Sequence, residues 1–556
     1  MAATIVPEQT RAQDSQFVSQ CSLAGLRARL PLRWPTPPET PPSPKTSYRS
    51  GYVHLGWEDL EDPAAWEHLS AFDLVLRLVD FSGLRPVLAQ LLGWTSGRGW
   101  EAFDPVSTFL LTGWQIVNRW KRAEVLRNVR DPRYADYAQR FGFRDGVFPT
   151  EGGMRYFLTT LGCNSQADDE TVQVEQGDQV IQVAVQRLNQ LLAQAVQLLR
   201  DAGLLSPQAW QQALICPDGQ LHDAASRARC SGVTDTCYHP TSASKPRPCP
   251  AQEKGWRGCD CDTLRCLLSC KRATPRDLEA RFIWYSGDNQ DEEQGNAGEA
   301  HYGYRSLALR LADTQRRFSI TLLSDVLPAN RREEVPAAAL LLQLARHYPD
   351  LVVDAVAGDA GLGFEVFLHT TYSHLRARRV IAQRRHSSDE NEKEWPLRGY
   401  DDRGRVLCQY GYAFSSNGFD RKRQRLKWIC AQACLKAIEP RVRLPNVTYP
   451  PPECPYQSAK HPHGRVLNVG ERFRNDSIRL VRDLPVGSPT WKALYHRARN
   501  AAEGRNATVE AWGLKRLPVY GLPRSKTLLF LADTWDTLTT LARLIREATA
   551  AFLEYP

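Results

Sequence analysis

The sequence lacks the long apolar runs that would cross a membrane, and it lacks the basic-then-apolar start of a secretory signal peptide. An excess of one charge sign is also missing, because 71 Lys and Arg residues face 62 Asp and Glu residues for a formal net charge of +9. Overall charge therefore says little about a nucleic-acid partner. These absences argue against a membrane or secreted protein, and we expect an intracellular, cytoplasmic one.

A clean C-x2-C pair is absent as well, although the chain has 14 cysteines. In a cytoplasmic protein, cysteines favour metal sites or free thiols over a disulfide framework. Seven of them fall within 230–270, in a segment expected to interrupt the core at 228–274. Structural zinc is one interpretation of this segment, and free thiols in a loop-rich insertion are the other. The candidate zinc ligands are Cys259, Cys261, Cys266 and Cys270.

The composition that is present is that of an ordinary globular protein, with 42% hydrophobic and 24% charged residues. A chain of 556 residues is long enough for two or three domains. The predicted layout is a flexible Pro-rich arm (1–50), a helical N-terminal domain (51–165), a connector helix (166–208), a first core part (209–386) with the Cys-rich insertion (228–274), an insertion domain with strand-like pieces (387–485), and a second core part with a carboxylate-bearing helix and a C-terminal helix (486–556).

The two core parts are predicted to form a multidomain α/β protein with a mixed sheet flanked by helices. A strand around Asp218 is followed by two strands at about 301–312 and 316–326, a helix, and a strand that ends at Asp359. A further helix and strand complete the pattern, which is typical of an α/β core. The first strand is expected to end at Asp218, in a turn.

Three acids stand out in this pattern. Asp218 and Asp359 mark two strands, and Glu503 lies on a late helix that starts at Ser488-Pro489. Three carboxylates suffice to hold a pair of divalent cations with open positions for phosphate and water. Glu510 shares a helix face with Glu503 and is the rival for the third acid.

Basic and aromatic residues accompany the third acid. Tyr495 and Arg499 lie on the same helix face as Glu503, and Arg505 follows it closely. These arginines could contact DNA phosphates and the tyrosine could stack on a base; a salt-bridged surface helix and a core tyrosine are the alternatives. A basic run in the insertion suggests a duplex-binding surface. Its candidate residues are Arg421, Lys422, Arg423, Arg425 and Lys427.

With these residues in view, the chain resembles DDE-type bacterial insertion-sequence transposases of the cut-and-paste kind. The resemblance is carried by Asp218-Gly219, the G-D-A-G sequence at Asp359, the Tyr495–Arg499–Glu503 segment and its lead-in R-L-V-R-D-L-P-V-G-S-P-T-W-K-A-L-Y. The arginine stands four residues after the tyrosine rather than three, and Glu510 occupies the position of a lysine in the family pattern. The third acid and the lysine's role are therefore open.

The resemblance implies a ribonuclease-H-like core that cleaves transposon ends and joins the 3′-hydroxyl to target DNA. It implies two Mg²⁺ per active site on Asp218, Asp359 and Glu503, with Mn²⁺ able to substitute. It also implies double-stranded DNA partners (terminal inverted repeats and target), a homodimer on DNA, and a bacterial cytoplasmic location, on the nucleoid when bound. The alternatives are an inactive DNA-binding regulator, a metal-dependent nuclease without strand transfer, and a zinc-stabilised interaction protein.

Overall fold

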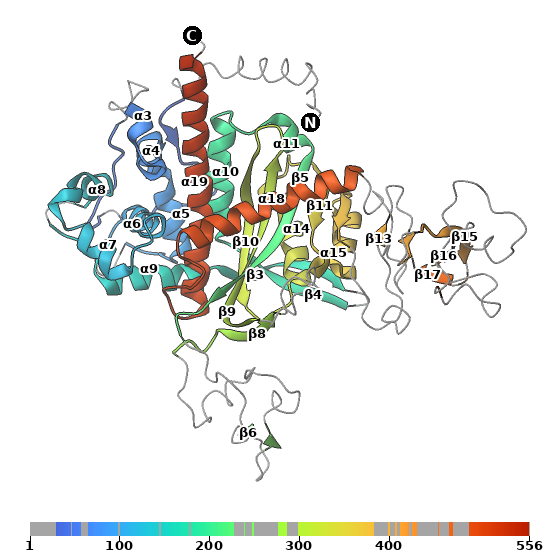
Figure 1. Cartoon of the computed structure of the whole chain (residues 1–556). Helices are drawn as coiled ribbons and strands as arrows, with labels where there is room; N and C mark the ends of the chain where they lie inside the picture. Colours follow the sequence, from blue (N-terminus) through green and yellow to red (C-terminus); the bar gives the residue numbers. More distant parts are fainter. Residues whose placement is uncertain are drawn as a thin grey trace, which may run out of the picture.

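The fold is known from a computed structural model (Figure 1). The structure describes residues 29–45, 47–56, 65–97, 101–143, 146–176, 179–226, 238–239, 247–248, 276–285, 299–382, 399–400, 406–408, 412–420, 422, 425–430, 454, 466–470 and 489–554.

A six-stranded mixed sheet forms the centre of the molecule. Its main path runs in the order β10-β9-β5-β11-β12, and β8 adds to β9. Neighbours from β10 to β5 are antiparallel, whereas β5, β11 and β12 are parallel. The predicted mixed sheet flanked by helices is confirmed. The strands are β5 (Ala213–Asp223), β8 (Arg281–Tyr285), β9 (Glu299–Asp313), β10 (Phe318–Pro328), β11 (Val353–Gly358) and β12 (Arg378–Ile381).

Helices cover both faces of this sheet. On one face, α14 (Glu334–His347) packs beside β9 and β10, and its Leu340 and Leu344 join a cluster with Ile215 and Val356. On the other face, α18 (Pro489–Ala511) crosses β5 and β11, as Figure 1 shows. Side chains alternate along a strand, so the two faces of β5 and β11 belong to different helices.

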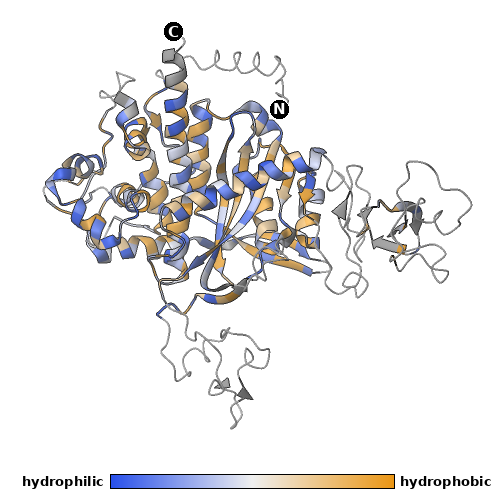
Figure 2. Cartoon of the chain, viewed as in Figure 1, coloured by the Kyte–Doolittle hydropathy of each residue, from blue (hydrophilic) through white to orange (hydrophobic). Residues whose placement is uncertain are grey.

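Small side chains allow α18 to lie close to the sheet. Ala498 and Ala501 are buried against Ala355 and Ala357 of β11, where no long side chain separates the backbones. The outer side of α18 is largely hydrophilic (Figure 2). Pro489 begins the helix as predicted.

The N-terminal helices share one hydrophobic core with the sheet. The C-terminal helix α19 (Leu522–Glu554) joins them, because it packs on β10 and also on α4, α6 and α9. Its Trp535 ring lies 4.8 Å from the ring of Phe72 and 5.5 Å from that of Phe109, over Gly113, where any Cβ would clash. The N-terminal helices are α3 (Ala65–His68), α4 (Ala71–Leu78), α5 (Leu84–Leu91), α6 (Pro105–Val117), α7 (Arg122–Asn128), α8 (Ala135–Arg140) and α9 (Glu151–Cys163).

Part of the predicted flexible arm is packed. In the described segment 29–45, β1 (Leu32–Arg33) pairs with β2 (Val79–Asp80), and Trp34 is only 2% exposed. The Trp34 indole donates a hydrogen bond of 2.7 Å to Gln194. The expectation of a flexible arm to residue 50 is therefore wrong for this segment.

The predicted connector helix is wrong in its first half. Residues there form a hairpin of β3 (Gln166–Gln176) and β4 (Gln179–Gln186), and α10 (Asn189–Asp201) begins only afterwards. The apolar residues of the hairpin alternate with polar ones and are mostly β-branched, a pattern that favours strands. Ile181, Val185 and Leu188 are spaced by four and then three residues, which also fits a helix and explains the error.

Short elements complete the described part. The predicted strand-like insertion contains β13 (Gly399–Tyr400), β14 (Val406–Leu407) and a three-stranded sheet of β15 (Ser415–Asp420), β16 (Arg425–Ile429) and β17 (Val466–Gly470). No helix in the described ranges is both long and apolar enough to span a bilayer. The remaining elements are α11 (Pro207–Gln211), α15 (Glu365–His369), β6 (Tyr238–His239), β7 (Arg247–Pro248), the 3-10 turns at Phe81–Gly83, Pro132–Tyr134 and Ala360–Leu362, and a π-helical turn at Thr370–His374.

Candidate active site

Strand register brings Asp218 and Asp359 together. β5 and β11 run parallel with Ile215 opposite Val356, so counting three residues further along each strand places Asp218 beside Asp359. Both aspartates belong to the face that α18 covers, since alternate residues share a face. Both line one small cavity under α18. Asp218 and Asp359, which the sequence was expected to bring to one site, lie next to each other in the structure.

Asp218 lies inside β5 rather than at its end. The strand continues to Asp223 because its antiparallel pairing with β9 persists beyond the last residue paired with β11. Burial raises the pKa of Asp218 above its ordinary value; an Asn506 hydrogen bond and Arg499 oppose this rise, and the charge of Asp359 adds to it. Asn506 Nδ2 donates to Asp218 Oδ2 at 2.7 Å. The structure therefore concentrates negative charge where water is largely excluded.

Asp359 is held by the turn that follows β11. Its Oδ1 accepts a hydrogen bond of 2.9 Å from the backbone N–H of Gly361. This bond fixes one oxygen and leaves the other available to a ligand. Asp354, which lies on β11 itself, pairs instead with Arg378.

Arg499 faces both aspartates from α18. Partial burial alone would lower the pKa of Arg499, but the nearby acidic groups outweigh this and raise it, Asp218 most and Asp359 least. The side chain lines the same small cavity, and its Nη2 lies 3.2 Å from Glu503 Oε1. A guanidinium between the strand acids and the helix acid offsets their mutual repulsion.

Glu503 lies at the outer edge of this site. Its side chain is 60% exposed and paired with Arg499. Its oxygens are not grouped with those of Asp218 and Asp359 within 4.8 Å; in the described ranges only Glu175, His369 and His374 form such a group. The carboxylates of Asp218, Asp359 and Glu503 are therefore not close enough to bind one ion in this arrangement. Arg499 lies near all three, because it pairs with Glu503 and is influenced by the charges of both aspartates.

The rival acid Glu510 has other partners. Glu510 Oε1 accepts from Gln220 Nε2 at 3.3 Å and from Lys515 Nζ at 3.1 Å. Gln220 is two residues beyond Asp218 on the same face of β5. Glu510 thus lies further along the strand than Glu503, and it is tied to a lysine rather than to Arg499.

Arg505 does not fit the expected phosphate contact. Its side chain is 2% exposed and forms an ion pair of 2.9 Å with the fully buried Asp533 of α19. It also donates to Gln220 and to Ser306 Oγ at 2.9 Å. A guanidinium enclosed by these groups fastens α18 to β5, β9 and α19. The position of Arg505 on a helix face does not predict this role, because α19 covers that side of α18.

His222 extends the same buried network. Its Nδ1 donates to the Leu514 carbonyl at 2.9 Å, so Nε2 accepts from Ser306 Oγ at 2.7 Å. Burial, with Arg505 nearby, lowers the pKa of His222 to about 3. His222 is therefore a neutral structural residue that fixes the segment after α18 on β5.

Tyr495 lines the cavity beside Arg499, but one face of its ring is already covered. It stacks on Trp491 with ring centroids 4.7 Å apart and an interplanar angle of 12°. The ring face that packs on Trp491 is therefore closed to a base.

Glu333, which the sequence analysis did not name, adds a charge close to the aspartates. It pairs with Arg305, and its carboxylate lies against Gly219, where a Cβ would approach Oε2 to 2.6 Å. Burial raises the pKa of Glu333 to about 7, Arg305 opposes the rise, and Asp359 and Asp218 add to it. Nothing in the R-R-E-E-V sequence distinguishes this residue from a surface acid.

Glu333 should make the stability of the metal-free protein depend on pH. Because Glu333 has a higher pKa when folded, the free energy of unfolding should fall as pH rises from about 4.5 to about 7, by at most about 3 kcal/mol. Glu333→Gln should remove that part of the decrease. Urea denaturation in EDTA at pH 5 and pH 8 measures it, with the exposed Glu547→Gln as control. Equal pH dependence in all three proteins would contradict the assignment.

The other predicted site residues are only partly described. Lys422 is exposed, and Arg425 and Lys427 lie on β16, whose basic side chains are not described. Arg421, Arg423, Cys259, Cys261, Cys266 and Cys270 lie outside the described residues.

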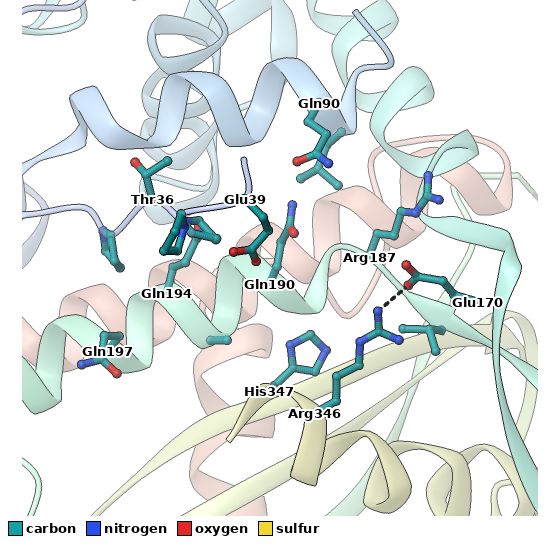
Figure 3. A pocket seen from close by; sticks show the side chains of 16 residues that line it. Thr36, Glu39, Gln90, Glu170, Arg187, Gln190, Gln194, Gln197, Arg346 and His347 are labelled. Atoms are coloured by element: carbon teal, nitrogen blue, oxygen red, sulfur yellow. Dashed lines mark ion pairs between the residues drawn. The ribbon is translucent and has the colours of Figure 1, made fainter. Parts of the chain in front are cut away.

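A larger cleft of about 610 Å³ lies away from the aspartates, between the N-terminal segment, α10 and α14 (Figure 3). Gln190 and Gln194 line it, and Arg346 pairs with Glu170 at 2.9 Å. His347 lies at its wall, with its pKa lowered to about 4 by burial and by Arg346. Among the described residues that line this cleft, no three acidic, histidine or cysteine side chains form a metal-binding group.

Comparison with known proteins does not assign a family. No protein-family model matches the chain, and a search of curated proteins finds no match. The function of the chain is therefore inferred from the geometry around Asp218 and Asp359.

Proposed function

We propose that the protein is a DNA transposase with a ribonuclease-H-like core, acting by metal-dependent phosphoryl transfer. The observation that carries the proposal is that Asp218 on β5 and Asp359 just after β11 lie next to each other, beneath a helix that presents Arg499 and Glu503. The strand order and the helices before and after β11 support the core assignment.

The residues present fit divalent cations of the magnesium type. Neighbouring, partly buried carboxylates repel each other, which helps to raise the pKa of Asp218, and hard cations with oxygen ligands relieve that repulsion. Asp218 and Asp359 would hold the ions, and Glu503 would complete the set by rotating away from Arg499. Bound there, Mg²⁺ supplies Lewis-acid activation of the attacking oxygen and neutralises the leaving oxygen.

The chemistry consists of two displacements at phosphorus. In the first, water oxygen bonds to the phosphorus at a transposon end and the P–O3′ bond breaks, which leaves a 3′-hydroxyl and a 5′-phosphate and releases a proton to solvent. In the second, that 3′-hydroxyl oxygen bonds to a target phosphorus and displaces the target 3′-oxygen, so joining conserves the number of phosphodiester bonds.

The chain's own residues orient these groups. The Asn506 amide holds one oxygen of Asp218, and Gly361 N–H holds one oxygen of Asp359, so both carboxylates are aimed before a substrate arrives. Arg499 can exchange Glu503 for a phosphate oxygen when DNA binds. The partners would be double-stranded terminal repeats and target DNA, with a homodimer pairing the two ends.

The third acid is tested by comparing Glu503→Gln with Glu510→Gln. The substrate is a supercoiled plasmid carrying the gene with its native flanking DNA, incubated with Mg²⁺. We expect Glu503→Gln to lower cleavage at least about 10³-fold and Glu510→Gln to lower it less than about tenfold, since only a metal ligand contributes several kcal/mol to the transition state. The reverse result would make Glu510 the third acid.

The products of the same assay separate the alternatives. Joined products from the wild type support a transposase, whereas 3′-hydroxyl ends that are never joined indicate a nuclease. End binding without any cleavage by the wild type would indicate an inactive regulator and would overturn the proposal.

A further inference from the structure

We propose that Glu175, His369 and His374 form a second metal site, for a transition ion of the zinc type. Their ligand atoms lie within 4.8 Å of one another, and they come from two separate elements, the β3 strand and the segment after β11. None of them belongs to the site around Asp218. The inference is independent of the proposed DNA chemistry.

A local departure from α-helical geometry brings the two histidines together. His374 stands five positions after His369, a spacing that places side chains on different sides of an α-helix. Here the chain forms a π-helical turn over Thr370–His374, whose wider turn returns residue i+5 to the same side. The two imidazole rings are consequently 5.9 Å apart with an interplanar angle of 85°.

The turn also ends in a strained conformation. Arg376 has φ of 53°, in the left-handed region that non-glycine residues seldom occupy. π-Turns and such residues are concentrated at functional sites, because the surrounding structure must compensate for their cost. The backbone is thus shaped so that both histidines face Glu175.

Glu175 completes a two-histidine, one-carboxylate set. Its Oε2 lies 3.6 Å from His369 Nδ1. Ligand atoms about 2.0–2.1 Å from a tetrahedral zinc ion are roughly 3.3 Å apart, so a small rotation suffices. The His369 side chain is 19% exposed and that of Glu175 is 51% exposed, so an ion can enter from solvent.

The donor atoms determine which ion would bind. Imidazole nitrogens favour Zn²⁺ and its first-row neighbours, whereas the oxygen-only Asp218 site favours Mg²⁺. An ion at Glu175 would cross-link the β3–β4 hairpin to the segment that directly follows Asp359. It would also leave at least one open position for water or an external ligand.

Cobalt distinguishes this site from thiolate sites elsewhere in the chain. The full chain, stripped with EDTA and kept reduced, is titrated with CoCl₂. Cobalt on histidine and carboxylate gives visible d–d bands without thiolate charge transfer. We expect these non-thiolate d–d bands in the wild type and in the control His68→Ala, which removes an exposed histidine. His374→Ala and Glu175→Gln should each bind at least about tenfold more weakly, since even partners of metal ligands affect affinity this much.

A thermal measurement gives a second readout. Zinc should raise the Tm of the wild type and of His68→Ala, because an ion that binds only the folded state stabilises it. The His374→Ala variant should lose most of that increase. The proposal is overturned if His374→Ala and Glu175→Gln both keep the non-thiolate cobalt bands and the zinc-dependent Tm of the control. Loss of DNA cleavage alone would bear only on the Asp218 site.

Discussion

Replacing Asp218 or Asp359 by asparagine should abolish DNA cleavage, by at least about 10³-fold, while the protein remains folded. Asparagine keeps the size of the side chain but removes the charge that holds the cations. For Asp218→Asn the metal-free protein should also become more stable at neutral pH, because burial disfavours the charged carboxylate, as its raised pKa indicates. Plasmid cleavage and thermal unfolding in EDTA measure the two effects.

Asp354→Asn is the matched control. Asp354 lies on the same strand as the residues leading to Asp359, but its carboxylate pairs with Arg378. Its replacement should leave cleavage within about threefold of wild type, because surface ion pairs contribute little. Cleavage by Asp218→Asn or Asp359→Asn at the control's rate would show that these acids do not take part.

The sheet was predictable from the sequence because its strands have strong local signals. The runs that became β9, β10 and β11 are bounded by turn residues and rich in buried apolar side chains. The same signals placed Asp218 and Asp359 on strands. Their adjacency needed the register of β5 against β11, which a single sequence does not contain.

The site residues that prediction missed depend on contacts distant in sequence. Glu333 becomes a site neighbour only because α14 starts beside Gly219. His369 and His374 have a spacing that fits neither helical nor strand periodicity, and only the π-turn brings them together. Sequence periodicity identifies a face of an element but not what covers that face.

Arg505 should prove essential for stability and dispensable for DNA contact. Arg505→Met leaves the Asp533 carboxylate buried without its partner, so the free energy of unfolding should fall by about 3–5 kcal/mol. The comparison is Arg499→Gln, whose paired Glu503 is exposed, so its stability should change by less than about 1 kcal/mol. Urea denaturation of both variants measures the difference.

For DNA binding, Arg499→Gln should have the larger effect and Arg505→Met the smaller one. Arg499→Gln should weaken binding to the gene's flanking DNA and reduce the slope of log affinity against log salt by about 1, as expected for one lost phosphate contact. At temperatures where the Arg505→Met variant is still folded, its slope of log affinity against log salt should equal that of the wild type. The double variant Arg505→Met/Asp533→Leu should recover much of the lost stability, because no unpaired charge stays buried. If Arg505→Met lowered the salt slope and left the free energy of unfolding unchanged, Arg505 would contact a DNA phosphate after all.

The central claim is that Asp218 and Asp359 jointly bind the divalent cations used in DNA cleavage. Anomalous diffraction from crystals of the protein with Mn²⁺ and its flanking DNA tests this most directly. We expect a manganese peak within about 2.0–2.3 Å of an oxygen from each aspartate, with Glu503 or Glu510 as the third acid. Manganese bound elsewhere, with both aspartates free of metal, would contradict the account.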